Sequence, residues 1–221
     1  MEERNVTVTL NKAKEWFNSG NATLKEIALQ AFDKDELTYN FKNITTFKKA
    51  CEALGLNYNA MFHITKSIAT ISKASAAMLK LNIIRKALNL GQDLHLTKDP
   101  EDSCIYYPYN PFVTKSSTYY ESSTYYKSEI NSGRMEVIGK IKSEEEEYNV
   151  LGGSAYSGGY DGLGNFRSHY DVGAAIAGIG FLGCANEEIA KHLGKYFGML
   201  ITEAKYGDIV DFEIIEEKYK I

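Results

Sequence analysis

Apolar residues recur every three or four positions through the first 90 residues, which is the spacing of amphipathic helices. Glycines able to adopt a left-handed conformation follow several of these segments and are expected to end them. We therefore predict about five helices before residue 91. They include 11–18, a helix that begins at a capping box over 23–26, a helix capped by Thr45 or Thr46, and a stretch over 59–90 that breaks near Ser72.

After Pro100 this spacing disappears and aromatic and β-favouring residues replace it. The prolines within 104–113 restrict that segment to an edge strand or an irregular extended chain. Alternation over 134–141 predicts a strand with Val137 and Ile138 on opposite faces, and Asn186 is expected to cap a helix over 186–203. The predicted fold class is α+β, with a helical N-terminal half followed by an antiparallel β-sheet with a C-terminal helix packed on it.

Composition and charge change at the same place. Residues 1–99 carry 14 Lys and Arg against 10 Asp and Glu, a net charge of +4, whereas residues 100–221 carry 11 against 19, a net of −8. Of the 16 tyrosines, 11 fall between Tyr106 and Tyr170. We predict a helical region over 1–99 and a Tyr/Gly-rich sheet region with the final helix over 100–221, either as two domains or as one cooperative unit.

The composition also restricts the class of protein. A hydrophobic fraction of 44% and a charged fraction of 24% are those of an ordinary globular chain and exclude a disordered or fibrous one. No apolar run reaches the roughly 18 residues that span a bilayer, and the first residues do not resemble a secretory signal. We expect a cytoplasmic protein with no membrane partner. The cysteines and histidines are scattered without metal-ligand spacing, so we expect no metal and no cofactor.

The most unusual feature of the second region is a duplicated hexapeptide, SSTYYE at 116–121 and SSTYYK at 122–127. Tyrosines in rows can form a flat amphipathic surface for a protein partner or a small ligand, and the alternative is a polar insertion loop. Ten glycines fall within residues 152–183 and predict turns or a close approach to a ligand. The predicted binding residues are Tyr106, Tyr107, Tyr109, Tyr119, Tyr120, Tyr125, Tyr126, Tyr156, Tyr160, Arg167 and His169.

A second candidate surface is basic. Residues 53–92 contain no Asp or Glu, and Lys66, Lys73 and Lys80 are seven apart, so they share one face if the helix is continuous. With Arg85 and Lys86 this face could follow the phosphates of a nucleic acid. The simpler interpretation is a solvated helix surface.

Catalytic signals are weak. Residues 178–183 match the GxGxxG fingerprint, but only 38 residues follow Gly183, too few for the remaining units of a dinucleotide fold, so we predict a packed strand over 174–182. Cys184 precedes a predicted helix N-terminus, and His169 or His192 could act as its base. We favour a protein without catalytic activity. A thiol enzyme that uses Cys184 is the alternative.

Several segments together suggest a family. They are KAKEWF at 12–17, FKKACEALG at 47–55, LNIIRKALN at 81–89, YYPY at 106–109 and FLGCANEEIAKHLGKYF at 181–197. With these motifs the chain resembles uncharacterised proteins from bacteriophages and prophages of gut Bacteroidota. The resemblance implies a viral or mobile-element origin, with the host cytoplasm or the virion as location. The leading hypothesis is a non-catalytic phage or prophage binding protein that engages a protein partner or small ligand through the tyrosine and glycine surface.

Overall fold

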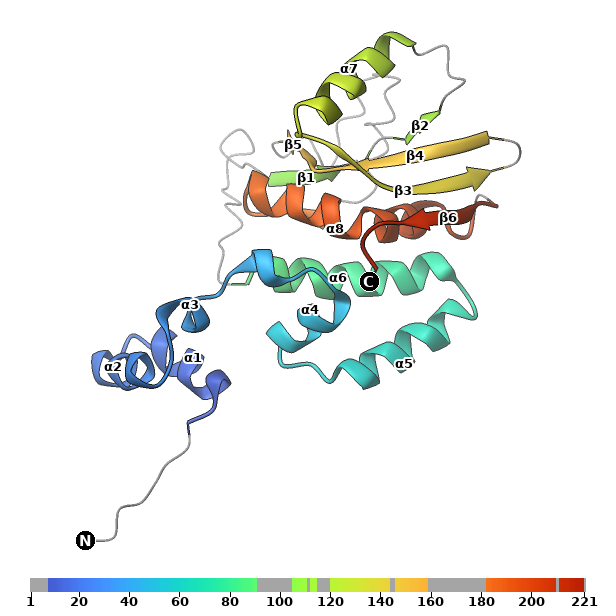
Figure 1. The fold of residues 1–221 in the computed structure, drawn as a ribbon. Helices are drawn as coiled ribbons and strands as arrows, with labels where there is room; N and C mark the ends of the chain where they lie inside the picture. Colours follow the sequence, from blue (N-terminus) through green and yellow to red (C-terminus); the bar gives the residue numbers. More distant parts are fainter. Residues whose placement is uncertain are drawn as a thin grey trace, which may run out of the picture. The chain divides into compact units, whose positions relative to one another are not determined.

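The structure is a computed structural model that describes residues 8–90, 105–110, 112–114, 120–143, 146–158, 182–209 and 211–220. Its internal contacts divide the chain into two compact units, Met1–Asn40 and Phe41–Ile221. The elements of both units are labelled in Figure 1.

The first unit is helical. It contains α1 (Leu10–Asn18), α2 (Ala22–Ala31) and the short α3 (Lys34–Leu37), which share a core of Ala13, Ala28 and Leu37. The helix predicted over 11–18 is confirmed. The capping box predicted at Thr23 is wrong, because the Asn21 side chain accepts the amide hydrogens of Thr23 and Leu24 and α2 begins at Ala22.

The second unit begins with four helical segments. They are η1 (Phe41–Asn43), α4 (Phe47–Ala53), α5 (Tyr58–Ala69) and α6 (Lys73–Leu88). Thr46 caps α4, and Gly55 follows it with a φ of +67°, both as predicted. The break near Ser72 is confirmed, since this residue caps α6 and its hydroxyl accepts the Ser75 amide hydrogen.

Strands and a long helix complete the second unit. Within the described residues β1 (Ile105–Tyr109) pairs with β5 (Ser154–Gly158), and a second sheet has the order β2 (Phe112–Thr114), β4 (Glu146–Gly152), β3 (Glu136–Ser143), β6 (Glu213–Glu217). All pairs are antiparallel. Within the described residues β1, which contains Pro108, and β2 are both edge strands, as predicted for this segment.

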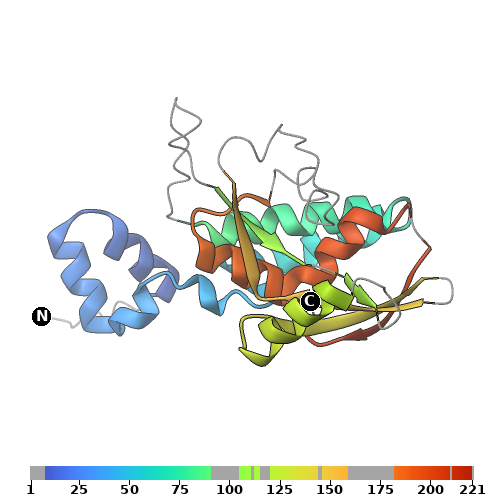
Figure 2. The same ribbon diagram turned by 90° about the horizontal axis from the view of Figure 1, so that it is seen from above.

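The long helix α8 (Glu187–Tyr206) lies between α6 and the strands, as Figures 1 and 2 show. Asn186 caps it, as predicted. Its side chains Ile189, Leu193 and Phe197 are fully buried, and on the strand side Gly198 leaves room for Asn110: a Cβ at Gly198 would lie 2.5 Å from Asn110 Nδ2. The predicted α+β class, with a C-terminal helix packed on strands, is confirmed.

The two compact units do not coincide with the composition change at residue 100. Helix α6 precedes that change and α8 follows it, yet the two pack together within the second unit. A folding border near residue 100 stays a prediction.

Two local predictions are wrong. Much of the duplicated hexapeptide forms a helix, α7 (Tyr120–Asn131), which Gly133 follows at a φ of +73°. Positions six apart share a face in a strand but lie on different faces of a helix. In β3 the register shifts between Val137 and Gly139, and this bulge turns Ile138, 1% exposed, into the core together with Met135.

Candidate functional site

A groove of about 540 Å³ opens beside the first half of α8. Its walls come from η1, the segment that enters β3, the turn between β4 and β5, and α8. Its volume is in the range of small-molecule sites in proteins, roughly 300–1,000 Å³. It is therefore the candidate binding site of the second unit.

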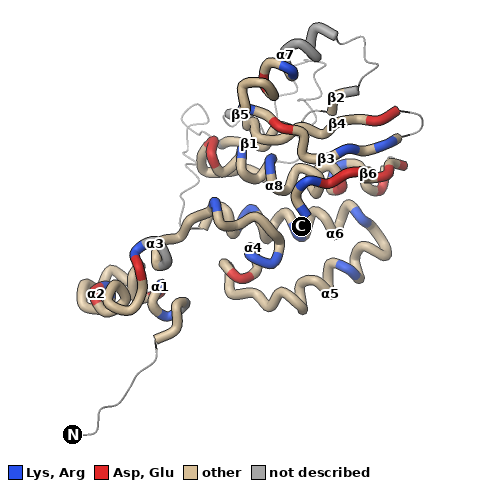
Figure 3. The backbone as a smooth tube through the Cα atoms, viewed as in Figure 1, with Lys and Arg blue, Asp and Glu red and all other residues tan. Residues whose placement is uncertain are grey.

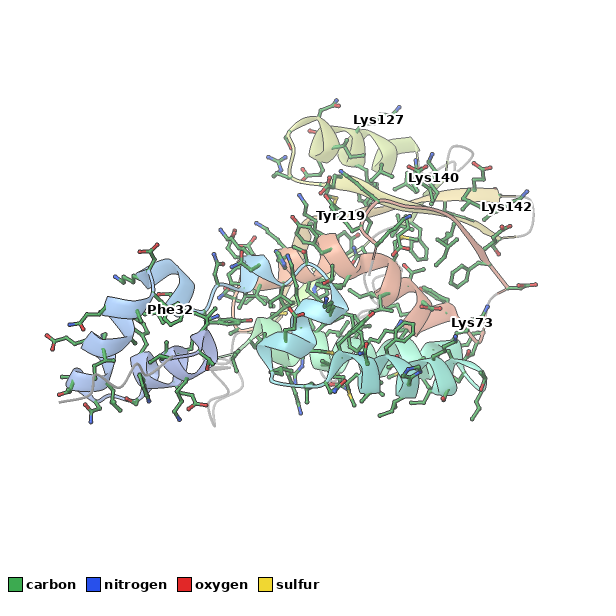
Figure 4. All side chains as sticks on the ribbon, turned by 60° about the horizontal axis from the view of Figure 1, so that its bottom comes forward. Phe32, Lys73, Lys127, Lys140, Lys142 and Tyr219 are labelled. Atoms are coloured by element: carbon green, nitrogen blue, oxygen red, sulfur yellow. The ribbon has the colours of Figure 1, made fainter. Side chains whose placement is uncertain are left out.

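Four aromatic rings follow one another along the groove and beyond it. The rings of Phe41 and His192 meet edge to face with centroids 5.5 Å apart, His192 and Tyr196 lie 4.5 Å apart, and Tyr196 and Tyr219 lie 4.6 Å apart. His192 and Tyr196 share a face of α8 because they are four residues apart. We call Phe41, His192, Tyr196 and Tyr219 the ring row; Figure 4 labels Tyr219.

His192 is held in one orientation. Its Nε2 lies 2.7 Å from the carbonyl oxygen of Ile44, and since a carbonyl can only accept, Nε2 carries the hydrogen. Burial lowers the pKa of His192, the bond to Ile44 opposes this shift, and the charges of Lys195 and Lys42 add to it. The ring is neutral near pH 7, with the lone pair on Nδ1.

Glu136, the first residue of β3, is the most strongly bound charge of the groove. Its carboxylate accepts hydrogen bonds from Lys195 Nζ and the Tyr219 hydroxyl, each at 2.7 Å, and from Lys218 Nζ. Burial raises the pKa of Glu136, but the three donors outweigh burial and lower it to about 2. We call Glu136, Lys195, Lys218 and Tyr219 the Glu136 cluster; it joins β3 to α8 and to the C-terminal residues.

The walls carry more positive than negative side chains. Lys42, Arg134, Lys191 and Lys195 line the groove, against the carboxylates Glu136 and Glu188. Arg134 donates to both Glu129 oxygens, at 2.9 and 2.5 Å, and Lys191 pairs with Glu187 at 2.7 Å. Arg134, Lys191 and Lys195 are thus each oriented by a carboxylate.

Some of the tyrosines predicted as binding residues lie outside the groove. Tyr107 and Tyr109 line a separate cavity of about 20 Å³, and the hydroxyls of Tyr109 and Tyr126 lie 3.0 Å apart. Tyr107 is 3% exposed, so it is a core residue rather than part of an open surface. Tyr106 exchanges backbone hydrogen bonds with Cys184.

The remaining predicted binding residues fall into two groups. For Tyr120, Tyr125 and Tyr156 the structure describes only the backbone, within α7 and β5. Tyr119, Tyr160, Arg167 and His169 lie outside the described residues, as do 174–181 of the predicted strand and glycine fingerprint.

The 20 Å³ cavity contains two polar groups that the sequence did not single out. Lys205 of α8 lines it, and burial lowers the pKa of its amine to about 8. Asn110 donates to the carbonyls of Leu151 and Gly194, while its Oδ1 is buried with no hydrogen-bond partner in the described part of the chain. A cavity of this size holds about one water molecule.

The basic residues are not on one face. Lys66 lies on α5, and Lys73 and Lys80 lie on α6, after the break at Ser72, so the continuous helix that a shared face requires is not formed. Lys73 and Lys80 lie close enough to Glu203 to lower the pKa of its carboxyl, although burial raises that pKa more strongly. Arg85 is half-buried near Cys184, and Lys86 is exposed.

Cys184 is a buried thiol. It is fully buried, and its Sγ lies 3.4 Å from the carbonyl oxygen of Leu182. Burial raises its pKa to about 12, although Asn89 and Arg85 act in the opposite direction. A nucleophilic cysteine needs a lowered pKa, so this environment argues against a thiol enzyme.

The described residues hold no group of three or more His, Cys, Asp or Glu side chains that could bind a metal ion. In the same part of the chain, no helix combines the length and apolar character needed to span a membrane. Comparisons with protein-family models, curated proteins and solved structures gave no match.

The groove beside α8 was not predicted from the sequence. Its central contacts join Glu136, Lys195 and Tyr219, which are far apart in the chain, and no local spacing brings them together. The available signal was the pair His192 and Tyr196, which stands at the helical spacing of four.

Proposed function

We propose that this chain is a non-catalytic binding protein that holds a small organic anion with a planar ring in the groove beside α8. The observation that carries the proposal is the combination of the ring row with cationic side chains along one groove of about 540 Å³. Phe41 and Tyr196 supply flat apolar surfaces, and Lys42 and Lys191 supply positive charge.

The state of the polar groups supports binding rather than catalysis. Glu136 has a pKa of about 2 and stays ionised near neutral pH, so it neither donates nor accepts protons there. His192 commits its Nε2 hydrogen to Ile44. Arg134, Lys191 and Lys195 are already oriented by carboxylates, which reduces the ordering that a ligand must impose.

Phenyl phosphate is a suitable probe because it joins a planar ring to an anion. Titrated into the isotopically labelled full chain, it should produce saturable NMR shifts of the amides of Gly153, Lys191 and Lys195. Inorganic phosphate and benzyl alcohol, which each lack one of the two features, should bind at least about tenfold more weakly. Shifts that do not saturate, or that are as large for either simpler probe, would contradict the proposal.

Two lysines form a matched pair for this titration. Lys191 lines the groove and pairs with Glu187 at 2.7 Å; Lys140 lies on β3 outside the groove lining and pairs with Glu216 at 2.6 Å. Their side chains are 38% and 39% exposed. Lys191→Gln should weaken phenyl phosphate binding roughly tenfold, while Lys140→Gln should leave it unchanged. Equal effects would place the anion outside the groove.

We also propose a protein partner for the tyrosine surface, supported by the contact between Tyr109 and Tyr126, which joins β1 to α7. Alanine replacement of Tyr119, Tyr120, Tyr125 and Tyr126 should weaken partner capture without unfolding the chain, and unchanged capture would refute the site. The resemblance to phage and prophage proteins supports a role in the host cytoplasm or the virion as part of the same proposal.

A further inference from the structure

Helices α4 and α5 are joined as in a helix-turn-helix. Four residues, 54–57, separate the end of α4 from the start of α5, and Gly55 within them has a φ of +67°. Buried Phe47, Ala50 and Cys51 anchor α4 in the second unit. In the helix-turn-helix of DNA-binding proteins, a three- or four-residue turn that often contains glycine connects two helices, and the second enters the major groove.

The two faces of α5 differ in kind. Tyr58, Met61, Thr65 and Ile68 are buried or half-buried and follow the spacing of one helix face. At 3.6 residues per turn the opposite face is centred on Asn59, His63, Lys66 and Ser67, all of them exposed. Amide, ammonium and hydroxyl groups are among those that read base edges in the major groove. The outward face of α5 is therefore polar at its centre and contains no carboxylate.

The helices that carry this face are strongly basic. Residues 41–90 contain eight Lys and Arg against the single acidic residue Glu52, a net charge of +7 within a chain of −4. Lys48 and Lys49 are exposed in the first turn of α4, where Lys48 lies 3.9 Å from Glu52 and Lys49 donates to the Thr45 hydroxyl. Figure 3 shows Lys and Arg along α4, α5 and α6. Such a charge excess complements a phosphate backbone.

We propose that α4 and α5 form a helix-turn-helix that binds duplex DNA, with α5 in the major groove. Asn59, His63 and Lys66 face the base edges, and Lys48 and Lys49 neutralise phosphates. Duplex DNA is favoured over duplex RNA because the major groove of A-form RNA is too deep and narrow for side chains to read. This surface is separate from the groove beside α8.

The test is fluorescence anisotropy of the full chain with a labelled mixed-sequence duplex of about 30 base pairs, long enough for three helical turns. Binding should weaken steeply as salt rises from about 50 to 200 mM. The variant with His63→Ala and Lys66→Gln should bind about tenfold or more weakly. The variant with Lys48→Gln and Lys49→Gln should lower the slope of log affinity against log salt by about 1 to 2.

A matched control removes the same number of charges elsewhere. Lys140 and Lys142 lie on β3, on the other side of α8 from α5 (Figures 1 and 4). The variant with Lys140→Gln and Lys142→Gln should keep both the affinity and the salt slope. Circular dichroism of each variant should match the parent spectrum.

Three results would overturn the proposal: no binding of the duplex at low salt, an equal loss of affinity in the β3 control, or tighter binding of duplex RNA of the same sequence. Each can occur whether or not phenyl phosphate binds in the groove, so failure here and failure of the proposed function are distinguishable.

Discussion

The groove beside α8 and the outward face of α5 are both basic, but their charges are organised differently. In the groove, Lys195 pairs with Glu136, Lys191 with Glu187, and Arg134 with Glu129. On α5, Lys66 makes no ion pair within the described residues, and neither α5 nor α6 contains a carboxylate. Paired cations have fixed positions that suit a small ligand, whereas an unpaired cation on a helix surface suits a partner that supplies its own negative charges.

The largest effect on stability is expected from a substitution that removes the ion pairs of Glu136 in the groove. Glu136→Gln removes the charge that Lys195 and Lys218 share, so the free energy of unfolding should fall by about 2 kcal/mol. Urea unfolding near pH 7 measures this change. Glu147→Gln, at an exposed position of β4, is the control and should have little effect. A loss in Glu136→Gln no larger than in the control would show that the cluster does not stabilise the groove.

The same carboxylate makes stability depend on pH. Its pKa of about 2 in the folded chain lies below the unfolded value of about 4.3, so its contribution is present above the unfolded pKa and is lost as the pH falls toward 2. Between about pH 5 and pH 2 the parent should therefore lose more stability than Glu136→Gln does. Parallel pH profiles of the two proteins would contradict this assignment.

A smaller effect on stability is expected from substitutions that compare the packing of α8 with that of the outward face of α5. Gly198→Ala on α8 places a Cβ against Asn110 and Ile138 and should destabilise the chain by about 1–2 kcal/mol. Ser67→Ala on the outward face of α5 should change stability by less than about 0.5 kcal/mol. Thermal unfolding of both variants measures the difference. Equal losses would mean that the outward face of α5 is packed as closely as α8.

Lys205 is a half-buried cation with no carboxylate partner in the part of the chain that the structure describes. The pKa of its amine, about 8 in the folded chain, lies below the unfolded value of about 10.4, so the amine destabilises the fold at pH 7 and this cost disappears as pH rises through the unfolded pKa. Lys205→Met should raise the free energy of unfolding by about 1 kcal/mol at pH 7. It should also remove the rise in stability between about pH 8 and 10. A destabilised variant would show that the amine has a partner.

The smallest expected effect is at Lys66. Because this side chain makes no ion pair within the described residues, Lys66→Gln should leave the unfolding free energy within about 0.5 kcal/mol of the parent. In the DNA titration the same variant should still lower the salt slope by about 1. If Lys66→Gln lowered the stability and left the salt slope of DNA binding unchanged, Lys66 would act as a paired, structural cation like those of the groove.

Much of the helical fold was predictable because its signals are local. Thr46, Ser72 and Asn186 are caps whose side chains bond amides three residues away, so a short window of sequence contains the whole interaction. The bulge in β3 was not predictable from alternation, because the shift depends on pairing with β4. The Glu136 cluster was missed for the same reason, since its members meet only when β3, α8 and the C-terminal residues pack together.

The most direct test of the account is the location of phenyl phosphate when it is bound. Intermolecular nuclear Overhauser effects should connect its ring protons with the rings of Tyr196 and Phe41, and Lys191→Gln should weaken these signals while Lys140→Gln preserves them. Ring contacts with residues outside the groove, or contacts that both variants weaken equally, would contradict the claim that the groove beside α8 binds a ring-bearing anion.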